Sequence, residues 1–417
     1  MRISTIQAFN SGVRGMQDNY SAVARTQEQV NTGKRLLTPA DDPVASVRLL
    51  QLGQEAGKLN QYKDNLKAAT NSLTQEEAIL NSVNNVLQRV REITLEAGNG
   101  ALDNAARNAL AQELGEREEE LYSLMNSQNA RGEYLFGGYS SDIQPFVKNP
   151  DGSYDYAGDE GQRSIQIGSS KTIAINDSGK ALFVDVPNVN RVDTAADGAN
   201  TGTARISLGV VENKSRYDSE FFSSGPVNIV ISADAAGYEI LDAAGDPLVP
   251  PVIGALEANP SGGYEIRHAG VVVTLDGEVA AGDSFTVSPR PTTDSGEKRG
   301  LLESVRLLRQ TLESTDDSTE GKLQRRDMLS VSLQNIDNAI GTVLGVQTSL
   351  GARLNVIEST QTQNDESTLI NATVQSGLED LDYAEALSRL SMQSIVLQAA
   401  QQSFVKVNGL SLFNFLR

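Results

Sequence analysis

The stretch IQAFNSGVRGMQDNYSAVARTQEQV (residues 6–30) repeats apolar side chains at alternating intervals of three and four. This spacing is the heptad pattern, which places the repeating positions on one face of an α-helix. A single polar residue, Gln27, interrupts the series. Because such a face is unstable when it is left in water, the stretch predicts a helix that packs against a partner. The predicted seam comprises Ile6, Phe9, Val13, Met16, Tyr20, Val23 and Val30.

Comparable seams occur on both sides of the middle of the chain. Residues 66–90 carry a second seam, residues 329–357 carry the longest one, and a helix is expected at about 103–135. The segment STDDSTEG (314–321) predicts a turn that separates the long seam from a shorter stripe at 301–312. A last helix is expected from about 378 to 407. Its stripe and the apolar end that follows comprise Tyr383, Leu387, Leu390, Leu397, Phe404, Leu410, Phe413, Phe415 and Leu416.

The centre of the chain has a different composition. Ten of the 12 prolines and 21 of the 36 glycines lie between residues 137 and 300. Both residue types interrupt helices, so this segment is expected to form strands and turns. Short β-branched or alternating runs predict six strands, at 163–167, 171–175, 227–232, 238–241, 270–275 and 284–288.

These patterns predict an α+β protein with a long antiparallel helical rod, or coiled coil, built from both termini and a mainly β central insert. Two independent helical hairpins are the alternative arrangement. By composition the chain divides into an N-terminal assembly helix and corner (1–45), two rod segments (46–136 and 301–376), the β-rich surface insert (137–300) and a C-terminal assembly helix (377–417). The insert has room for two subdomains.

Composition also excludes several functions. The chain has no Cys and one His, which removes thiolate metal sites, Cys nucleophiles and two-histidine metal motifs. Its formal net charge of −19 argues against binding nucleic acid through a broad basic surface. No run approaches the roughly 18 apolar residues of a transmembrane helix, and MRISTIQAFNSG lacks the apolar core of a secretory signal peptide. We therefore expect no membrane insertion and either a cytoplasmic location or export without a cleaved signal.

Few residues suggest chemistry. His268 has no neighbouring nucleophile in sequence, and the calcium-like series that begins at Asp151 lacks the Gly and Glu of an EF-hand loop. We therefore expect no catalytic, cofactor or metal site. The local motif with a clear physical consequence is a corner, because two prolines break the helix and acidic side chains can cap the next one. It comprises Thr38, Pro39, Asp41, Asp42 and Pro43.

Composition and spacing thus favour a structural or interaction protein without saying which. The stretch NTGKRLLTPADDPVASVRLL (31–50) resembles the N-terminal signature of the flagellin superfamily. The opening MRIST and the form TPADDPVA resemble the branch that joins hook to filament more than flagellin itself. RGEYLFGGYSSDIQPF (131–146), SLGARLN (349–355) and the segment 386–417 are similar to further motifs of this superfamily.

The resemblance implies a structural subunit of the bacterial flagellum that forms the layer between hook and filament. It implies as partners further copies of the chain, another hook-associated protein on the hook side, flagellin on the filament side and an export chaperone near the C-terminus. It also implies an extracellular location, reached through the flagellar type III export channel. The alternatives are a flagellin filament subunit and, from another class, a secreted adhesin or enzyme carried by the β insert.

Two further expectations follow from where the seams lie. Because they lie outside residues 137–300, the insert should be peripheral to assembly. The apolar ends have only each other as partners within one chain, so we expect them to be disordered in the free subunit and to fold on assembly.

Overall fold

The computed structural model describes residues 5–100, 102–259, 262–290, 294–314 and 316–415. The chain forms two compact units. We call residues 1–66, 167–170 and 358–417 the terminal unit, and residues 67–166 and 171–357 the body unit. Two long helices, α2 (Pro43–Ala97) and α8 (Thr319–Glu379), contribute residues to both.

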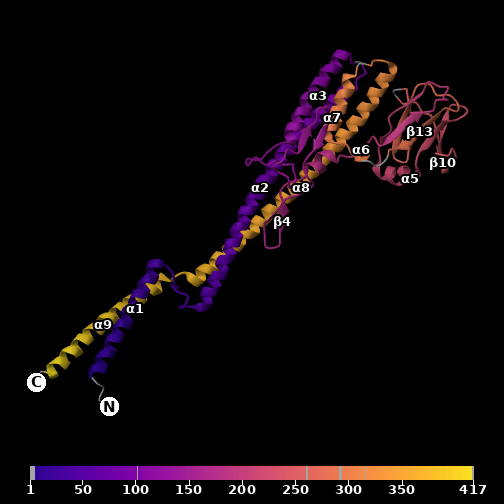
Figure 1. The fold of residues 1–417 in the computed structure, drawn as a ribbon. Coiled ribbons are helices and arrows are strands. Elements are labelled where there is room, and N and C mark those ends of the chain that lie inside the picture. The colour runs from indigo at the N-terminus through magenta and orange to yellow at the C-terminus, as the bar shows by residue number, and fades with distance from the viewer. Residues whose placement is uncertain (1–4, 101, 260–261, 291–293, 315, 416–417) are drawn as a thin grey trace. The chain divides into compact units, whose positions relative to one another are not determined.

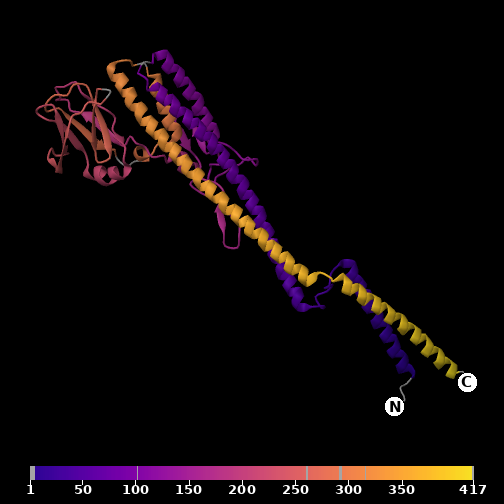
Figure 2. The same ribbon diagram turned by 180° about the vertical axis from the view of Figure 1, so that it is seen from behind.

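The terminal unit consists of helices from the two ends of the sequence. Helix α1 (Thr5–Thr32) runs antiparallel to α9 (Tyr383–Phe415), as Figures 1 and 2 show. In the same unit the Asn371 amide of α8 donates to the Leu52 carbonyl of α2 at 3.1 Å, and Lys63 lies 3.2 Å from Asp365. The N-terminal helices therefore pair with the C-terminal ones, as predicted, and do not form separate hairpins.

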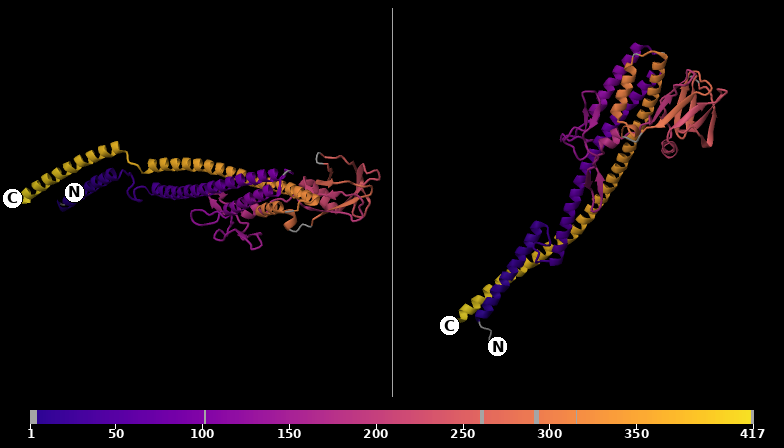
Figure 3. Two further views of the ribbon diagram at one scale, coloured as in Figure 1. Left: turned by 90° about the horizontal axis from the view of Figure 1, so that it is seen from above. Right: turned by 45° about the vertical axis from the view of Figure 1, so that its right-hand side comes forward.

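In the body unit, α2 and α8 lie beside α3 (Asn104–Met125) and α7 (Leu301–Glu313) in one helical bundle (Figures 1 and 3). Every predicted seam position of α2 from Ala69 to Val90 is at most 2% exposed. On α8 the seam is equally well buried at Ile336, Val343 and Leu350. The heptad pattern of the body thus becomes a closed apolar core, which is the main source of stability for paired helices.

One member of the body seam is a carboxylate. Glu76 is 2% exposed, and its Oε1 accepts a hydrogen bond of 3.1 Å from the backbone N–H of Asp177. The Asp177 carboxylate in turn accepts two hydrogen bonds of 2.9 Å from Arg353 of α8. Glu76 Oε2 is buried and has no hydrogen-bond partner among the described residues. These three residues connect α2, the segment after strand β4 (Thr172–Ala174) and α8.

Two helix boundaries differ from the expected ones. Helix α3 ends at Met125 instead of continuing to 135, because the Asn126 side chain bonds to both backbone groups of Phe146. Asn129 then closes a turn that Gly132 completes at φ +79°. The last helix does not begin at 378. Helix α8 ends at Glu379 and α9 starts at Tyr383, where the Asp382 carboxylate accepts the backbone N–H of Ala384 at 2.9 Å.

The insert contains two β parts, both in the body unit. In the first, β1 (Phe146–Lys148) pairs with β2 (Tyr154–Tyr156), and β3 (Ser164–Gln166) pairs with β4. The second is a two-sheet lobe beside α8 (Figures 1 and 3). Its larger sheet has the order β10 (Pro247–Ala255), β9 (Gly237–Asp242), β8 (Val227–Ile231), β13 (Ser284–Pro289) and β5 (Val192–Ala196).

The smaller sheet has the order β11 (Tyr264–His268), β12 (Val271–Asp276) and β6 (Arg205–Ile206), and β7 (Val210–Val211) also pairs with β12. All strand pairs in the lobe are antiparallel, and its apolar core includes Ile240, Leu275 and Phe285. Short helical segments complete the insert, namely η1 (Lys180–Val184), α4 (Lys214–Arg216), η2 (Tyr217–Phe221), α5 (Phe222–Ser224) and α6 (Asp294–Glu297).

All six predicted strands are present, and the prediction of an α+β protein with helical ends and a central β insert is confirmed. The remaining strands were not predicted. Strand β10 contains three prolines, and β6 and β7 have two residues each, so neither type shows a recognisable alternation. The division into five segments by composition remains a prediction. The two compact units do not test it, because their boundaries fall within α2 and α8.

The two-sheet lobe is fastened to α8 by buried polar groups. Asp276 of β12 pairs with Arg326, and Asp327 lies 2.8 Å from Arg205 of β6. Where the chain enters the lobe, Asn335 of α8 bonds to the Asn188 side chain at 3.0 Å. These contacts satisfy polar groups that would otherwise be buried without partners.

Candidate assembly surface of the terminal unit

The pair formed by α1 and α9 has an aromatic contact near the chain ends. The rings of Phe9 and Phe404 lie 5.3 Å apart, and a side chain at Gly12 would meet the Phe404 ring at 3.0 Å. Glycine at this position therefore lets the ring approach the backbone of α1. Farther along, Val13, Met16 and Val23 of α1 and Leu390 and Leu397 of α9 are only half-buried, because the described contacts of each helix are mainly with the other.

Apart from Ala386, which is fully buried, the buried side chains described in this pair are polar. Thr26 is 3% exposed, and its hydroxyl lies 2.7 Å from Oε1 of Gln393. Arg389 donates to Gln29 Oε1 at 3.3 Å. Polar contacts within an otherwise apolar helix pair favour one register over others, because any shift would bury these groups without partners.

The predicted seam divides into two sets. Val13, Met16, Val23, Val30, Leu390, Leu397 and Phe404 are half-buried. Tyr20 is 66% exposed, Tyr383 and Leu387 are each 51% exposed, and Phe9 is 46% exposed. Ile6, Leu410, Phe413 and Phe415 fall within α1 and α9, but their side chains are not described, and Leu416 lies outside the described residues. The predicted seam therefore provides both the α1–α9 contact and part of an outward surface.

More exposed apolar side chains lie outside the predicted seam. They occur at the start of α2, at the end of α8 and along α9, and comprise Val44, Val47, Leu50, Leu369, Ile370, Val374, Met392, Ile395, Val396 and Val405. Spacings of three or four residues within these groups were the signal that sequence reasoning missed. A terminal unit with this much exposed apolar surface is typical of a chain that buries it against other molecules.

The predicted corner is present, with separate tasks for its two acidic residues. The Asp42 carboxylate accepts the backbone N–H groups of Val44 and Ala45, at 3.1 and 3.0 Å, so it caps α2. Asp41 was also expected to cap this helix, and that part was wrong. Its carboxylate accepts the preceding N–H groups of Leu37 and Thr38, because the turn at Pro39 directs it backwards.

Asp41 is also paired with Arg25 of α1. The backbone N–H of Thr38, followed by that of Leu37, holds the pKa of Asp41 below its usual range. Since these partners all precede Asp41, the carboxylate joins the end of α1 to the turn. The two adjacent acids thus fix the exit from one helix and the entry into the next.

The segment that follows α1 is hydrogen-bonded to the segment that joins α8 to α9. The Arg35 N–H donates to the Glu379 carbonyl at 2.7 Å, and the Leu381 N–H donates to the Gly33 carbonyl at 3.0 Å. Lys34 forms an ion pair with Glu379. Gly33 has φ +70°, and a side chain there would meet the Tyr383 hydroxyl at 2.9 Å. Both ends of the chain therefore change direction at one shared, hydrogen-bonded joint.

Two further residues singled out in the sequence, His268 and Asp151, have local contacts in the insert. His268 is half-buried beside Phe221, with ring centroids 6.4 Å apart, and burial lowers its pKa. Asp151 accepts from the N–H and hydroxyl of Ser153 in a turn. Within the described ranges, no three acidic or histidine side chains are grouped to hold a metal ion. None of the helices described has the length and apolar character needed to cross a bilayer.

Comparisons with known proteins agree with this architecture. The family model of the bacterial flagellin N-terminal helical region matches residues 3–141, and that of the flagellin C-terminal helical region matches residues 333–416. Together they cover more than half of the chain. The chain belongs to the flagellin superfamily, whose members are structural components of the bacterial flagellum.

Within that superfamily the chain groups with hook-associated protein 3. It is 24% identical to the flagellar hook-associated protein 3 of Salmonella typhimurium over 417 residues, which is 100% of both chains. The flagellin of Salmonella moscow is also 24% identical, but over 68% of this chain and 57% of its own. The flagellar junction protein of Legionella pneumophila has a similar structure, with a TM-score of 0.63, 28% identity, and coverage of 80% of this chain and 99% of its own. The branch indicated by TPADDPVA is confirmed, and flagellin is the weaker match.

Proposed function

We propose that the chain is a structural subunit of the layer that joins the flagellar hook to the filament, and that it is not an enzyme. The observation that carries this proposal is the terminal unit, where apolar side chains remain exposed on α1, α2, α8 and α9 although the helices are already paired. Burying such surface contributes about 25 cal/mol per Å². Neighbouring subunits are the partners that a polymer supplies.

The finer parts of the proposal concern those partners. Copies of the chain form a ring-like layer, with another hook-associated protein on the hook side and flagellin on the filament side. The relatives named above support this assignment, since their names place them at the hook or at the junction. We further propose that the chain leaves the cell through the flagellar export channel and that a chaperone covers its apolar C-terminal helix beforehand.

Assembly also gives a reason for the incomplete α1–α9 contact. Each helix has one partner within the chain, across almost the full length of the sequence, and closing that loop is entropically costly. We propose that α1 and α9 order fully only when neighbouring copies cover their outward faces. Hydrogen exchange on the purified subunit tests this step. Exchange of these two helices as slow as that of the body unit would contradict it.

The test of the main proposal is a deletion strain examined by electron microscopy. Hooks that persist without filaments are expected, and normal filaments would contradict the proposal.

Complementation with Met392→Ser plus Ile395→Ser should then fail to hold filaments, because these side chains are 66% and 60% exposed and face outward. Gln398→Ser, an exposed polar change on the same helix, is the matched control and should restore attachment.

A further inference from the structure

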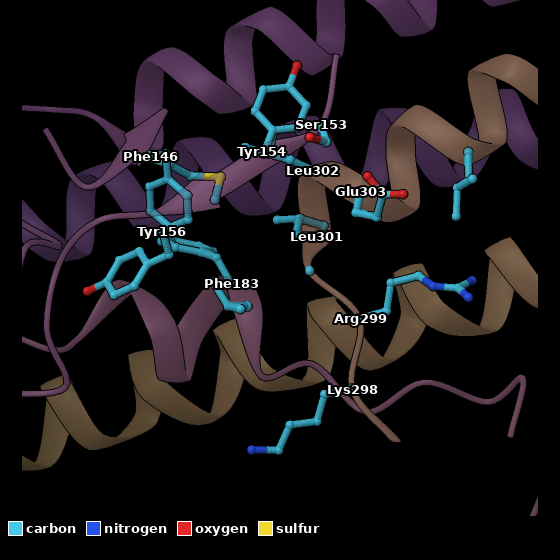
Figure 4. A pocket seen from close by; sticks show the side chains of 14 residues that line it. Phe146, Ser153, Tyr154, Tyr156, Phe183, Lys298, Arg299, Leu301, Leu302 and Glu303 are labelled. Carbon is cyan, nitrogen blue, oxygen red and sulfur yellow. The ribbon is translucent and has the colours of Figure 1, made fainter. Parts of the chain in front are cut away.

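A cavity of about 410 Å³ opens on the body unit, beside the start of α7. Figure 4 shows the rings of Phe146, Tyr156 and Phe183 grouped on one side of it and Arg299 with Glu303 on the other. The Phe146 ring lies 5.1 Å from that of Tyr156 and 6.0 Å from that of Phe183. Because the Tyr156 hydroxyl lies 2.9 Å from both the Phe136 and Asp159 carbonyls, which lie outside the cavity, its ring presents an apolar wall.

One charge at this cavity forms no ion pair among the described residues. Lys298 pairs with Asp185 at 2.9 Å, and Glu303 accepts from Arg306 at 2.8 Å. The Arg299 guanidinium makes no hydrogen bond or ion pair with any residue that the structure describes, although the side chain is half-buried. Burial, followed by the nearby Arg290 charge, lowers the pKa of Arg299, and the Glu303 carboxylate opposes this shift without forming an ion pair with it. The cavity therefore combines apolar walls with an unpaired positive charge.

A loop of the same unit has complementary features. Tyr139 and Ile143 are 67% and 55% exposed, and the exposed Asp142 carboxylate between them has no hydrogen bond or ion pair within the described part of the chain. The Asp159 carboxylate holds this 139–143 loop by accepting the N–H groups of Tyr139 and Ser140 at 2.8 and 2.9 Å. Two large apolar side chains and a free carboxylate are thus presented on a preorganised turn, which reduces the entropic cost of binding.

We propose that the 139–143 loop of one copy docks into the Arg299 cavity of a second copy of this chain. Tyr139 and Ile143 would contact the aromatic wall, and Asp142 would pair with Arg299. In a chain with 54 acidic and 35 basic side chains, copies repel one another unless local charges are matched, and this contact matches two unpaired ones. The loop and the cavity are different surfaces, so the contact is head-to-tail and can repeat around a closed layer. The inference rests on the proposed junction layer.

Because the chain has no cysteine of its own, introduced cysteines in it can form disulfides only with each other. Asp142→Cys combined with Arg299→Cys should give a ladder of disulfide-linked oligomers when intact hook–filament structures are mildly oxidised. Asp142→Cys combined with Ser219→Cys is the matched control, because Ser219 is exposed elsewhere on the insert, and it should give no ladder. Filaments that stay attached without a ladder from the first pair would overturn the docking contact and leave the junction function standing. An equal ladder from the control pair would also overturn it.

A charge exchange separates docking from folding. Arg299→Asp and Asp142→Arg should each increase filament shedding under shear at least several-fold, while circular dichroism of the purified subunits stays unchanged. Combining both substitutions should restore attachment toward the unsubstituted level. If the combined variant sheds filaments as readily as the worse single variant, the Asp142–Arg299 pairing is overturned.

Discussion

The body unit and the terminal unit use the same heptad spacing with opposite results. In the body, the α2 seam from Ala69 to Val90 is closed by neighbouring helices and excludes water. In the terminal unit, Tyr20, Tyr383 and Leu387 follow the same rule of spacing and remain at least half exposed. The difference is the number of helices available. The body has several helices together with strands, whereas α1 and α9 have mainly each other. A heptad seam thus identifies a helix face that needs a partner. The number of neighbouring helices decides whether that face is buried within the chain or left exposed.

The comparison predicts that truncating a leucine lowers the free energy of unfolding far more in the body unit than in the terminal unit. Leu80→Ala in the body should lower the free energy of unfolding by about 3–5 kcal/mol, because its fully buried side chain would leave a cavity. Leu387→Ala in the terminal unit should lower it by less than about 0.5 kcal/mol, since half of that side chain already contacts water. Urea denaturation of the two subunits measures both values. Similar losses would show that the terminal seam is already closed in the free subunit.

The buried Glu76 predicts how the stability of the body depends on pH. Burial, assisted by the nearby Asp177 charge, raises the pKa of Glu76 to about 8 from its ordinary 4.5. Below pH 4.5 the carboxyl is protonated both folded and unfolded, so it adds no pH dependence. Between pH 4.5 and 8 the unfolded chain releases the proton first, so stability should fall as pH rises, by on the order of 5 kcal/mol in total.

Glu76→Gln should remove this component and make the body unit more stable than the unsubstituted protein at pH 8. Thermal unfolding between pH 5 and 8 measures it. Glu77→Gln, a half-buried neighbour outside the seam, is the control and should keep the original slope. A Glu76→Gln protein with an unaltered slope would show that another group carries the dependence.

Substitutions at the corner should change the stability of the subunit less than substitutions at Leu80 or Glu76. Asp42→Ala removes the cap of α2 and should cost about 1 kcal/mol, whereas Asp42→Asn keeps an acceptor and should cost little. Asp41→Ala should instead loosen the end of α1, because its hydrogen-bond partners precede it. Amide exchange at the first turn of α2 and at the turn of residues 37–38 distinguishes the two. Replacing both acids by Ala should misdirect α1 and weaken filament attachment, and an unchanged junction would leave the pair as surface charge.

Removing the two-sheet lobe should have the smallest effect on assembly. Deleting about residues 190–290 and rejoining the ends with a short turn should leave filament attachment largely intact, since the exposed apolar surface of the terminal unit is untouched. Asp327, buried now against Arg205, would become solvated and need no counterion. Shear resistance of the filaments measures the outcome. Shedding at the rate of a strain without the protein would mean that the two-sheet lobe also stabilises the layer.

Much of the fold was accessible from local pattern. Periods of three and four residues identified the helices, and glycine and proline marked the insert. Six strands were recognised because β-branched residues alternate in them. Short strands such as β6 and β7 were missed, since two residues cannot show a period. The end of α3 was also missed, because the hydrogen bonds of Asn126 to Phe146 depend on a strand twenty residues away.

The sequence by itself determined that this protein has helical ends with unsatisfied apolar faces and a β-rich centre. Those properties follow from spacing and composition, which act locally along the chain. Only the tertiary structure decided which seams are closed, that Asp41 faces α1 and Asp42 faces α2, and that an unpaired Arg299 lies beside an aromatic cavity. Such features arise from contacts between residues distant in sequence, and no local pattern specifies which distant groups will meet.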